Sequence, residues 1–147
     1  AYICAGFAII TQLQNMTAHD WQIDYYNPKD NIVYSFVIQQ NGLDIKESKG
    51  NIQNENASFT KLELDKVMIT PMQAYQDLLA KEEKQPIVSK LIIVIQQKET
   101  QPQYNLTMIT QQLSVIHARV NAQLGDIISV NHQNLMSFAQ MTPGKKK

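Results

Sequence analysis

The chain has 147 residues (16.8 kDa) with 13 basic and 13 acidic side chains, so its formal net charge is zero. A protein that contacts several nucleic-acid phosphates needs a basic face, so this balance argues against a nucleic-acid partner. The lone cysteine, Cys4, excludes an intramolecular disulfide and a thiolate metal cage. An apolar content of 44% is enough for a core without either. We expect a single compact domain over residues 1–147.

The N-terminal segment is the most apolar part of the chain. Its unbroken apolar stretch is about ten residues, short of the ~20 needed to cross a bilayer. Within it Ile3, Phe7, Ile10 and Leu13 recur at helical spacing, which predicts an amphipathic core helix. The alternative interpretation is the end of an anchor. Because the chain begins with Ala1, we expect that a signal peptide or membrane anchor upstream has been removed, which would place the protein outside the cytoplasm.

The next segment has the alternation of a β-sheet. A strand is predicted from Trp21 to Tyr26, and Asn27-Pro28-Lys29-Asp30 is typical of a type I turn. A second strand follows over Ile32–Gln40, and Asn41-Gly42 predicts a tight hairpin into a third strand, Leu43–Ser48. Residues 59–64 alternate again and predict an additional strand.

The second half begins with a strong helix signal. Thr70 can cap a helix, Pro71 suits its first position and Gln73 can complete a capping box, so a helix is predicted to about Glu83. Four strand-like segments follow, at Leu91–Ile95, Tyr104–Thr110, Leu113–Gln123 and Asp126–Val130, the last two joined around Gly125.

The order of elements therefore repeats with an offset of roughly 70 residues. The sequence predicts an α+β fold of two tandem units, 1–65 and 66–147, each an antiparallel sheet packed by one helix.

The second half resembles a PepSY-type domain, a cystatin-like unit of one helix and an antiparallel sheet. The resemblance covers about 60 residues, from 70 to 130, and rests on four segments: Thr70-Pro71-Met72-Gln73-Ala74, the strand Leu91–Ile95, Tyr104-Asn105-Leu106-Thr107, and the run from Ala118 to Ile128. The sequence departs from the family pattern at Asn121, where Asp is usual, and at Leu124, where Thr is usual. The resemblance implies a non-catalytic, extracytoplasmic module of the kind found in protease propeptides and bacterial envelope proteins, with an inhibitory or protein-binding role.

Two histidines test the idea of a metal site. A two-residue turn at Leu124-Gly125 would place His117 opposite His132, close enough to share a metal. A three-residue turn with Gly125 in the left-handed conformation instead pairs Ala118 with Val130 and Val120 with Ile128. Hydrophobic patterning favours this second register because it keeps the apolar row on one face. The pair His19-Asp20 could transfer protons, but a histidine at a helix C-terminus is the simpler interpretation.

The sequence contains none of the common nucleophile, zinc, P-loop or C-x-x-C motifs, so we assign no catalytic, cofactor-binding or metal residue and expect no cofactor. The leading hypothesis is a non-catalytic, extracytoplasmic binding or regulatory module whose partner is a protein, such as an envelope protein or a protease. The alternative is a pocket for a small ligand, or for catalysis, between helix and curved sheet, with at least ~300 Å³ of space and several convergent polar groups. Its candidate lining is Trp21, Tyr25, Tyr26, Tyr34 and Tyr104.

The predicted strand Leu43–Ser48 bears on self-association. It carries Asp44, Lys46 and Glu47, with Lys49 directly after it. Such charges discourage pairing between sheet edges. A homodimer would therefore use another edge.

Overall fold

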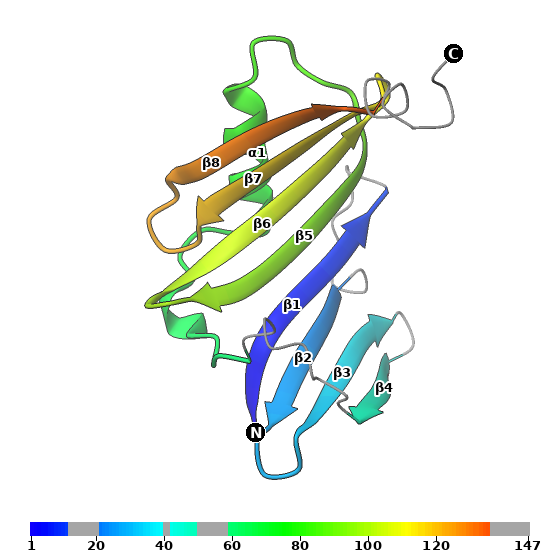
Figure 1. Cartoon of the computed structure of the whole chain (residues 1–147), viewed down its shortest axis with the longest axis vertical. Helices are drawn as coiled ribbons and strands as arrows, with labels where there is room; N and C mark the ends of the chain where they lie inside the picture. The colour runs from blue at the N-terminus through cyan, green and yellow to red at the C-terminus, as the bar shows by residue number, and fades with distance from the viewer. Residues whose placement is uncertain (12–20, 40–41, 50–58, 136–147) are drawn as a thin grey trace, which may run out of the picture.

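The computed structural model describes residues 1–11, 21–39, 42–49 and 59–135, which form one eight-stranded sheet with the order β4-β3-β2-β1-β5-β6-β7-β8 (Figure 1). Every neighbouring pair of strands is antiparallel. The strands are β1 (Tyr2–Ile10), β2 (Trp21–Asn27), β3 (Ile32–Gln39), β4 (Gly42–Lys49), β5 (Val88–Lys98), β6 (Gln101–Thr110), β7 (Ser114–Asn121) and β8 (Ile127–Asn134).

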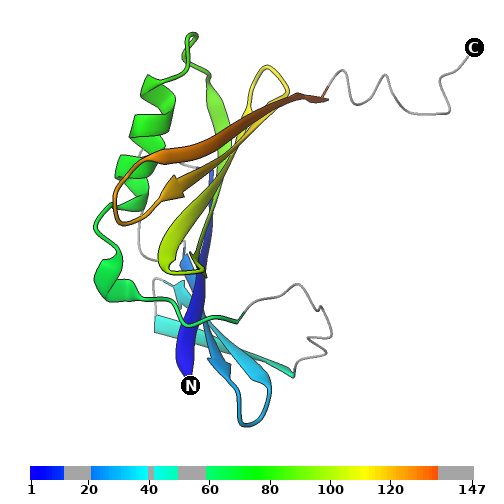
Figure 2. The same cartoon turned by 60° about the vertical axis from the view of Figure 1, so that its left-hand side comes forward.

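The sheet consists of two four-stranded meanders placed side by side. β1 to β4 form one meander and β5 to β8 the other, and the pairing of β1 with β5 joins them. The connection between the meanders contains a 3-10 turn, η2 (Leu64–Lys66), and the helix α1 (Pro71–Ala80). Figure 2 shows α1 against the face of the β5–β8 meander, with no helix on the corresponding face of β1–β4 among the described residues.

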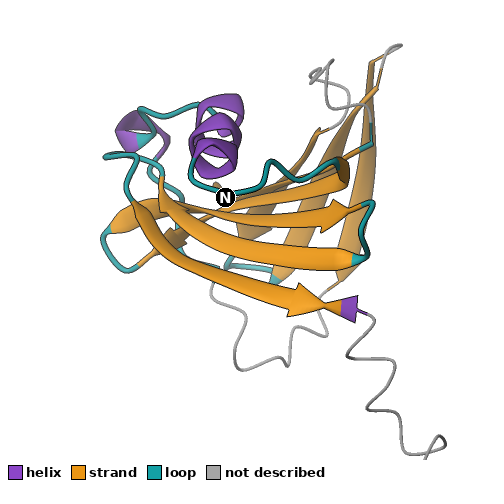
Figure 3. Cartoon of the chain, turned by 90° about the horizontal axis from the view of Figure 1, so that it is seen from above, coloured by secondary structure: helices purple, strands orange, loops and turns teal. Residues whose placement is uncertain are grey.

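The core lies between α1 and this face of the sheet. From the helix, Ala74 and Leu78 are fully buried and Tyr75 is nearly so. Opposite them lie the alternate residues of the central strands, such as Ile93 and Leu106. Seen from above, α1 lies against one face of the twisted sheet (Figure 3). The apolar stripe of a surface helix needs such a cover, and here the sheet supplies it.

The predicted tandem α+β fold is wrong. Residues 2–10 form the strand β1 rather than a helix, so the described residues of the two halves share one sheet, and α1 packs only against the second half of it. Buried positions alternate along β1, at Cys4, Gly6, Ala8 and Ile10, with the period of a strand. The helical stripe was misleading because nearly every residue of this segment is apolar, and such a run matches both periods.

Several local predictions are confirmed. β2, β3 and β4 follow one another in the predicted order, but Gly42 is the first residue of β4 and pairs with Gln39 instead of forming the turn, and Asn41 lies outside the described residues. The Thr70 side chain accepts a hydrogen bond from the Gln73 backbone N–H (3.1 Å) at the start of α1, which has Pro71 at its first turn. The helix ends at Ala80, earlier than predicted. The extra strand predicted at 59–64 is wrong, because residues 59–63 belong to no strand and Leu64 begins η2.

The two edges of the sheet differ in charge. β4 is one edge and contains the acidic and basic residues that the sequence places there. β8 is the other edge, and its eight residues include no Lys, Arg, Asp or Glu. The prediction that a homodimer would avoid the β4 edge therefore points to β8 as the edge to examine, since β8 lacks the charged side chains that discourage pairing between sheet edges.

Candidate binding groove

An apolar groove lies on the helix-bearing face of the sheet, over the meander that α1 does not cover. Its volume is about 410 Å³, within the range of small-ligand sites. We call it the β1–β3 groove. Its lining residues are Ile3, Ala5, Gly6, Ile23, Tyr25, Phe36, Ile38, Leu62, Leu64 and Ile95.

The floor of the groove is made of cross-strand rows, as strand register requires. One row runs from β5 across to β4 and consists of directly paired residues: Ile95, Gly6, Ile23, Phe36 and Ile45. The adjacent cross-strand row consists of Ile3, Tyr25 and Tyr34. Residues in one row share a face of the sheet, so these apolar side chains gather on the same surface. The side chains along β2 and β3 are nearly all half-buried, and Ile45 is 59% exposed.

Gly6 lies at the centre of this floor. A Cβ at this position would lie 2.9 Å from Cγ2 of Ile95 and 3.6 Å from the ring of Trp21. The backbone of β1 therefore comes closer to its neighbours' side chains than any residue with a Cβ would permit.

One wall of the groove is the segment 59–64, which is fixed to the first two strands. The Leu62 N–H donates to the Ile3 carbonyl (2.8 Å). The Tyr2 hydroxyl donates to the Phe59 carbonyl (2.6 Å), and the Phe59 ring stacks on Tyr26 with centroids 4.7 Å apart. Leu62 is consequently buried, while Leu64 beside it is 52% exposed above the groove.

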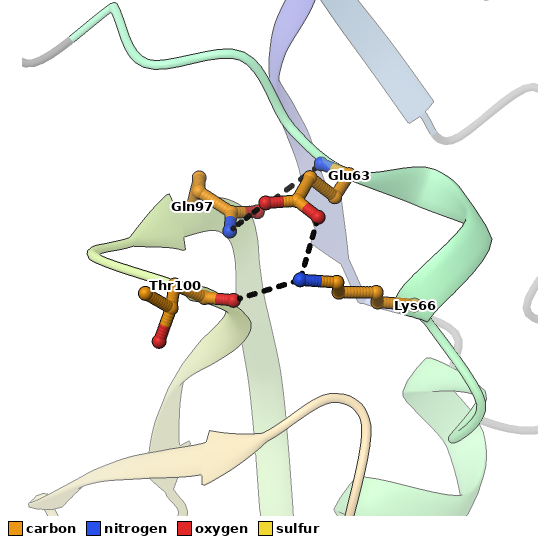
Figure 4. A network of polar contacts seen from close by, with 4 residues as sticks. All are labelled: Glu63, Lys66, Gln97 and Thr100. Carbon is orange, nitrogen blue, oxygen red and sulfur yellow. Dashed lines mark hydrogen bonds and ion pairs between the residues drawn. The ribbon is translucent and has the colours of Figure 1, made fainter.

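A polar clamp holds the same wall to the β5–β6 turn (Figure 4). The Glu63 N–H donates to Oε1 of Gln97 (3.1 Å), and Nε2 of Gln97 donates to the Glu63 carboxylate (3.2 Å). Nζ of Lys66 pairs with the same carboxylate (2.7 Å) and reaches the Thr100 carbonyl (3.4 Å). Gln97 is buried, so its two hydrogen bonds exchange little with water.

The lining of the groove is almost entirely apolar. Its only side-chain polar atom is the Tyr25 hydroxyl, since all other lining residues are aliphatic, glycine or Phe. The lining therefore contains no carboxylate, imidazole, thiol or amine that could act as a base, nucleophile or metal ligand. Among the described residues, moreover, no group of three or more His, Cys, Asp or Glu side chains could hold a metal ion.

The aromatic residues proposed as a pocket lining have different positions. Tyr25 lines the β1–β3 groove, Tyr34 pairs with it, and Trp21 borders the floor at Gly6. Tyr26 belongs to the wall through its stacking on Phe59. Tyr104 lies in the core under α1, where its hydroxyl donates to the Ile69 carbonyl (2.6 Å) and burial raises its pKa to about 12.

The predicted pocket between helix and sheet is therefore misplaced. The interface of α1 with the sheet is closely packed, and the open space lies beside it, without the convergent polar groups that the sequence-based hypothesis required. Sequence reasoning missed Gly6, Ile23, Phe36 and Ile38. A signal was present in β2, where Trp21, Ile23 and Tyr25 alternate with polar residues and so mark one apolar face.

The histidines follow the register that hydrophobic patterning favoured. Ala118 pairs with Val130, and Gly125 has the predicted left-handed conformation (φ 86°). A bulge shifts the end of the hairpin, so Val120 pairs with Ile127 instead of the predicted Ile128.

His117 and His132 have separate partners. Nδ1 of His117 lies 3.0 Å from the Thr107 hydroxyl, and Nε2 of His132 lies 2.7 Å from the Glu82 carboxylate. The two imidazoles are not paired with each other across the hairpin. His19 and Asp20 lie outside the described residues.

Comparison with known proteins gives one match, at the level of structure. No family model matches the sequence. No curated protein matches it significantly. The crystal structure of a candidate lipoprotein from Clostridium difficile 630 matches with a TM-score of 0.61 and 17% identity, covering 90% of this chain and 83% of that one. The two proteins share a fold.

At this identity the likeness extends to the fold alone. The PepSY resemblance stays a prediction. In the described part of the chain, no helix is long and apolar enough to cross a bilayer.

Proposed function

We propose that this chain is a non-catalytic binding module that acts outside the cytoplasm and holds an apolar group of its partner in the β1–β3 groove. The observation that carries the proposal is that the apolar face covered by α1 continues, uncovered by any described helix, over the other meander. An exposed apolar patch of this kind is typical of an interaction site.

The lining supports binding rather than catalysis. General acid–base or nucleophilic catalysis needs a titratable or nucleophilic side chain near the reacting atoms, and Tyr25 supplies the only side-chain hydroxyl. A polar metabolite would lose its hydrogen bonds to water here without replacement, at a cost of roughly 1–3 kcal/mol for each group. The groove therefore favours an apolar ligand surface over a polar small molecule.

Two observations support the location. The fold is similar to that of a candidate lipoprotein, and the PepSY resemblance implies an extracytoplasmic module. Fractionation of the source cells, followed by detection of the native protein with an antibody, tests it. We expect the protein in the envelope or the secreted fraction, and recovery with the cytoplasmic markers would contradict the location.

Binding of the apolar dye anilinonaphthalene sulfonate to the folded protein tests the groove. We expect one saturable site whose affinity falls about tenfold or more in Ile38→Asp, because a carboxylate in the lining disfavours an apolar ligand. The matched control is Leu124→Asp, at a 69% exposed turn position away from the groove, which should bind like the original protein. Equal loss in both variants, or no saturable binding, would overturn the proposal.

A further inference from the structure

Each meander has an apolar face that must be covered. A described helix covers the face of only one of the two meanders. An apolar sheet face must pack against another element to be removed from water. α1 does this for β5–β8 through Ala74, Tyr75 and Leu78. The β1–β3 groove continues that same interface, since Ile95 and Leu62 belong both to the core under α1 and to the groove lining.

The footprint of the open face matches a short helix. From β1 to β4 is three strand spacings, about 14 Å. Along β2, the distance from Trp21 to Tyr25 is four residue steps, about 13 Å. A helix is about 10–12 Å wide with its side chains, and ten residues, the length of α1, extend about 15 Å. One helix of this size would cover the face.

Other apolar occupants fit less well. An extended peptide would place its own N–H and C=O groups against a lining with one hydroxyl, where they would stay unpaired. A hydrocarbon chain is narrow and would cover one row of the floor, leaving the neighbouring half-buried rows in water. A helix satisfies its backbone hydrogen bonds internally and brings side chains to several rows at once.

We propose that the β1–β3 groove binds an amphipathic α-helix of a partner protein, in the manner in which α1 packs on the adjoining meander. The inference rests on the proposed binding function and names the kind of partner. The helix would present an apolar stripe at i, i+3, i+4 and i+7. The charged side chains of residues 59–66 are Lys61, Glu63, Asp65 and Lys66, whose charges sum to zero, so binding should depend little on ionic strength.

Trp21 provides the reporter for a test. It is the only tryptophan in the chain, and its ring borders the floor at Gly6. Covering the floor removes water from this ring and should shift its emission to shorter wavelength. Tryptophan-free, alanine-based helical peptides of 14 residues with Leu and Phe in a stripe are titrated into the intact protein. Peptides with the same composition in scrambled order serve as controls, and laurate is titrated separately.

We expect saturable binding of the striped peptides in about the micromolar range, with a blue shift of Trp21. Scrambled peptides should bind at least tenfold more weakly. Ile38→Asp should weaken binding by about tenfold or more, and Leu124→Asp should not change it. A photoactivatable leucine in the stripe should cross-link to β2 or β3. Circular dichroism and thermal melting establish that each variant is folded, and Ile38→Ser replaces Ile38→Asp if the latter unfolds.

The remaining outcomes separate the two proposals. Saturable binding of laurate without binding of striped peptides would overturn the helix proposal and keep the apolar binding function. Equal binding of striped and scrambled peptides would also overturn it, because the surface would then lack preference for a helix. Absence of binding by every peptide, by laurate and by the dye would overturn the binding function itself.

Discussion

Gly6 of β1 is paired directly with Ile95 of β5, and Cγ2 of Ile95 occupies the space next to Gly6 where a Cβ would come within 2.9 Å. This contact lies at the junction of the two meanders and at the floor of the β1–β3 groove. The same contact therefore affects both the joining of the two meanders and the shape of the candidate site.

Gly6→Ala should lower the stability of the protein. Alanine in a strand normally gains about 0.5–1 kcal/mol over glycine, but here the new methyl group must displace a β-branched side chain whose χ1 is stiff. We expect a net loss of about 1 kcal/mol in the free energy of unfolding, measured by urea denaturation. Ile95→Ala removes Cγ2, so the same substitution in that background should be less costly. An equal cost in both backgrounds would contradict the contact.

The stability should fall in alkaline solution. Burial raises the pKa of Tyr104 to about 12 and also raises the pKa of Tyr75. An unfolded tyrosine ionises near pH 10, so between about pH 10 and 12 the unfolded state binds fewer protons than the folded state. The stabilisation is fully present below pH 10 and is lost as the pH rises towards 12. Tyr104→Phe should flatten this decline, as followed by denaturation at several pH values. If the free energy of unfolding of Tyr104→Phe falls with pH as steeply as that of the original protein, the titrating group is not Tyr104.

Cys4 should be chemically inert in the folded protein. Its side chain is 4% exposed, its Sγ lies 3.4 Å from the Asp24 carbonyl, and burial, helped by the charge of Asp24, raises its pKa to about 11. The thiolate is the reactive form, so both access and ionisation are lacking at neutral pH. We expect iodoacetamide to label Cys4 only after denaturation, as seen by mass spectrometry of the intact protein. Labelling of the native protein at the rate of free cysteine would contradict this burial.

The stability of the polar clamp on the groove wall should depend more on Gln97 than on Lys66. Gln97→Ala leaves the Glu63 N–H without its partner, which costs roughly 1–3 kcal/mol. The Lys66–Glu63 ion pair is more than one-third exposed on both sides, so Lys66→Ala should cost under about 1 kcal/mol. Hydrogen exchange of the Glu63 amide measures the difference. If the Glu63 amide exchanges faster in Lys66→Ala than in Gln97→Ala, Lys66 contributes more to the clamp than Gln97.

The sequence by itself determined the local elements. The turn before Ile32 and the cap at Thr70 each act over a few residues, so their geometry follows from the residues present. The pairing of Ala118 with Val130 could also be predicted, because a slip by one residue would move a whole apolar row into water.

Only the tertiary structure decided that β1 is a strand and that it pairs with β5. The first ten residues are apolar on every side, so their pattern fits a helix or a strand equally, and the choice depends on neighbours more than 80 residues away. The groove depends on the same pairing. The row of the groove floor forms only after β1 joins the two meanders: Gly6, Ile23, Phe36 and Ile95. In the described part of the chain, α1 then covers the β5–β8 meander and leaves this row open. Long-range contacts of this kind leave no mark in local periodicity.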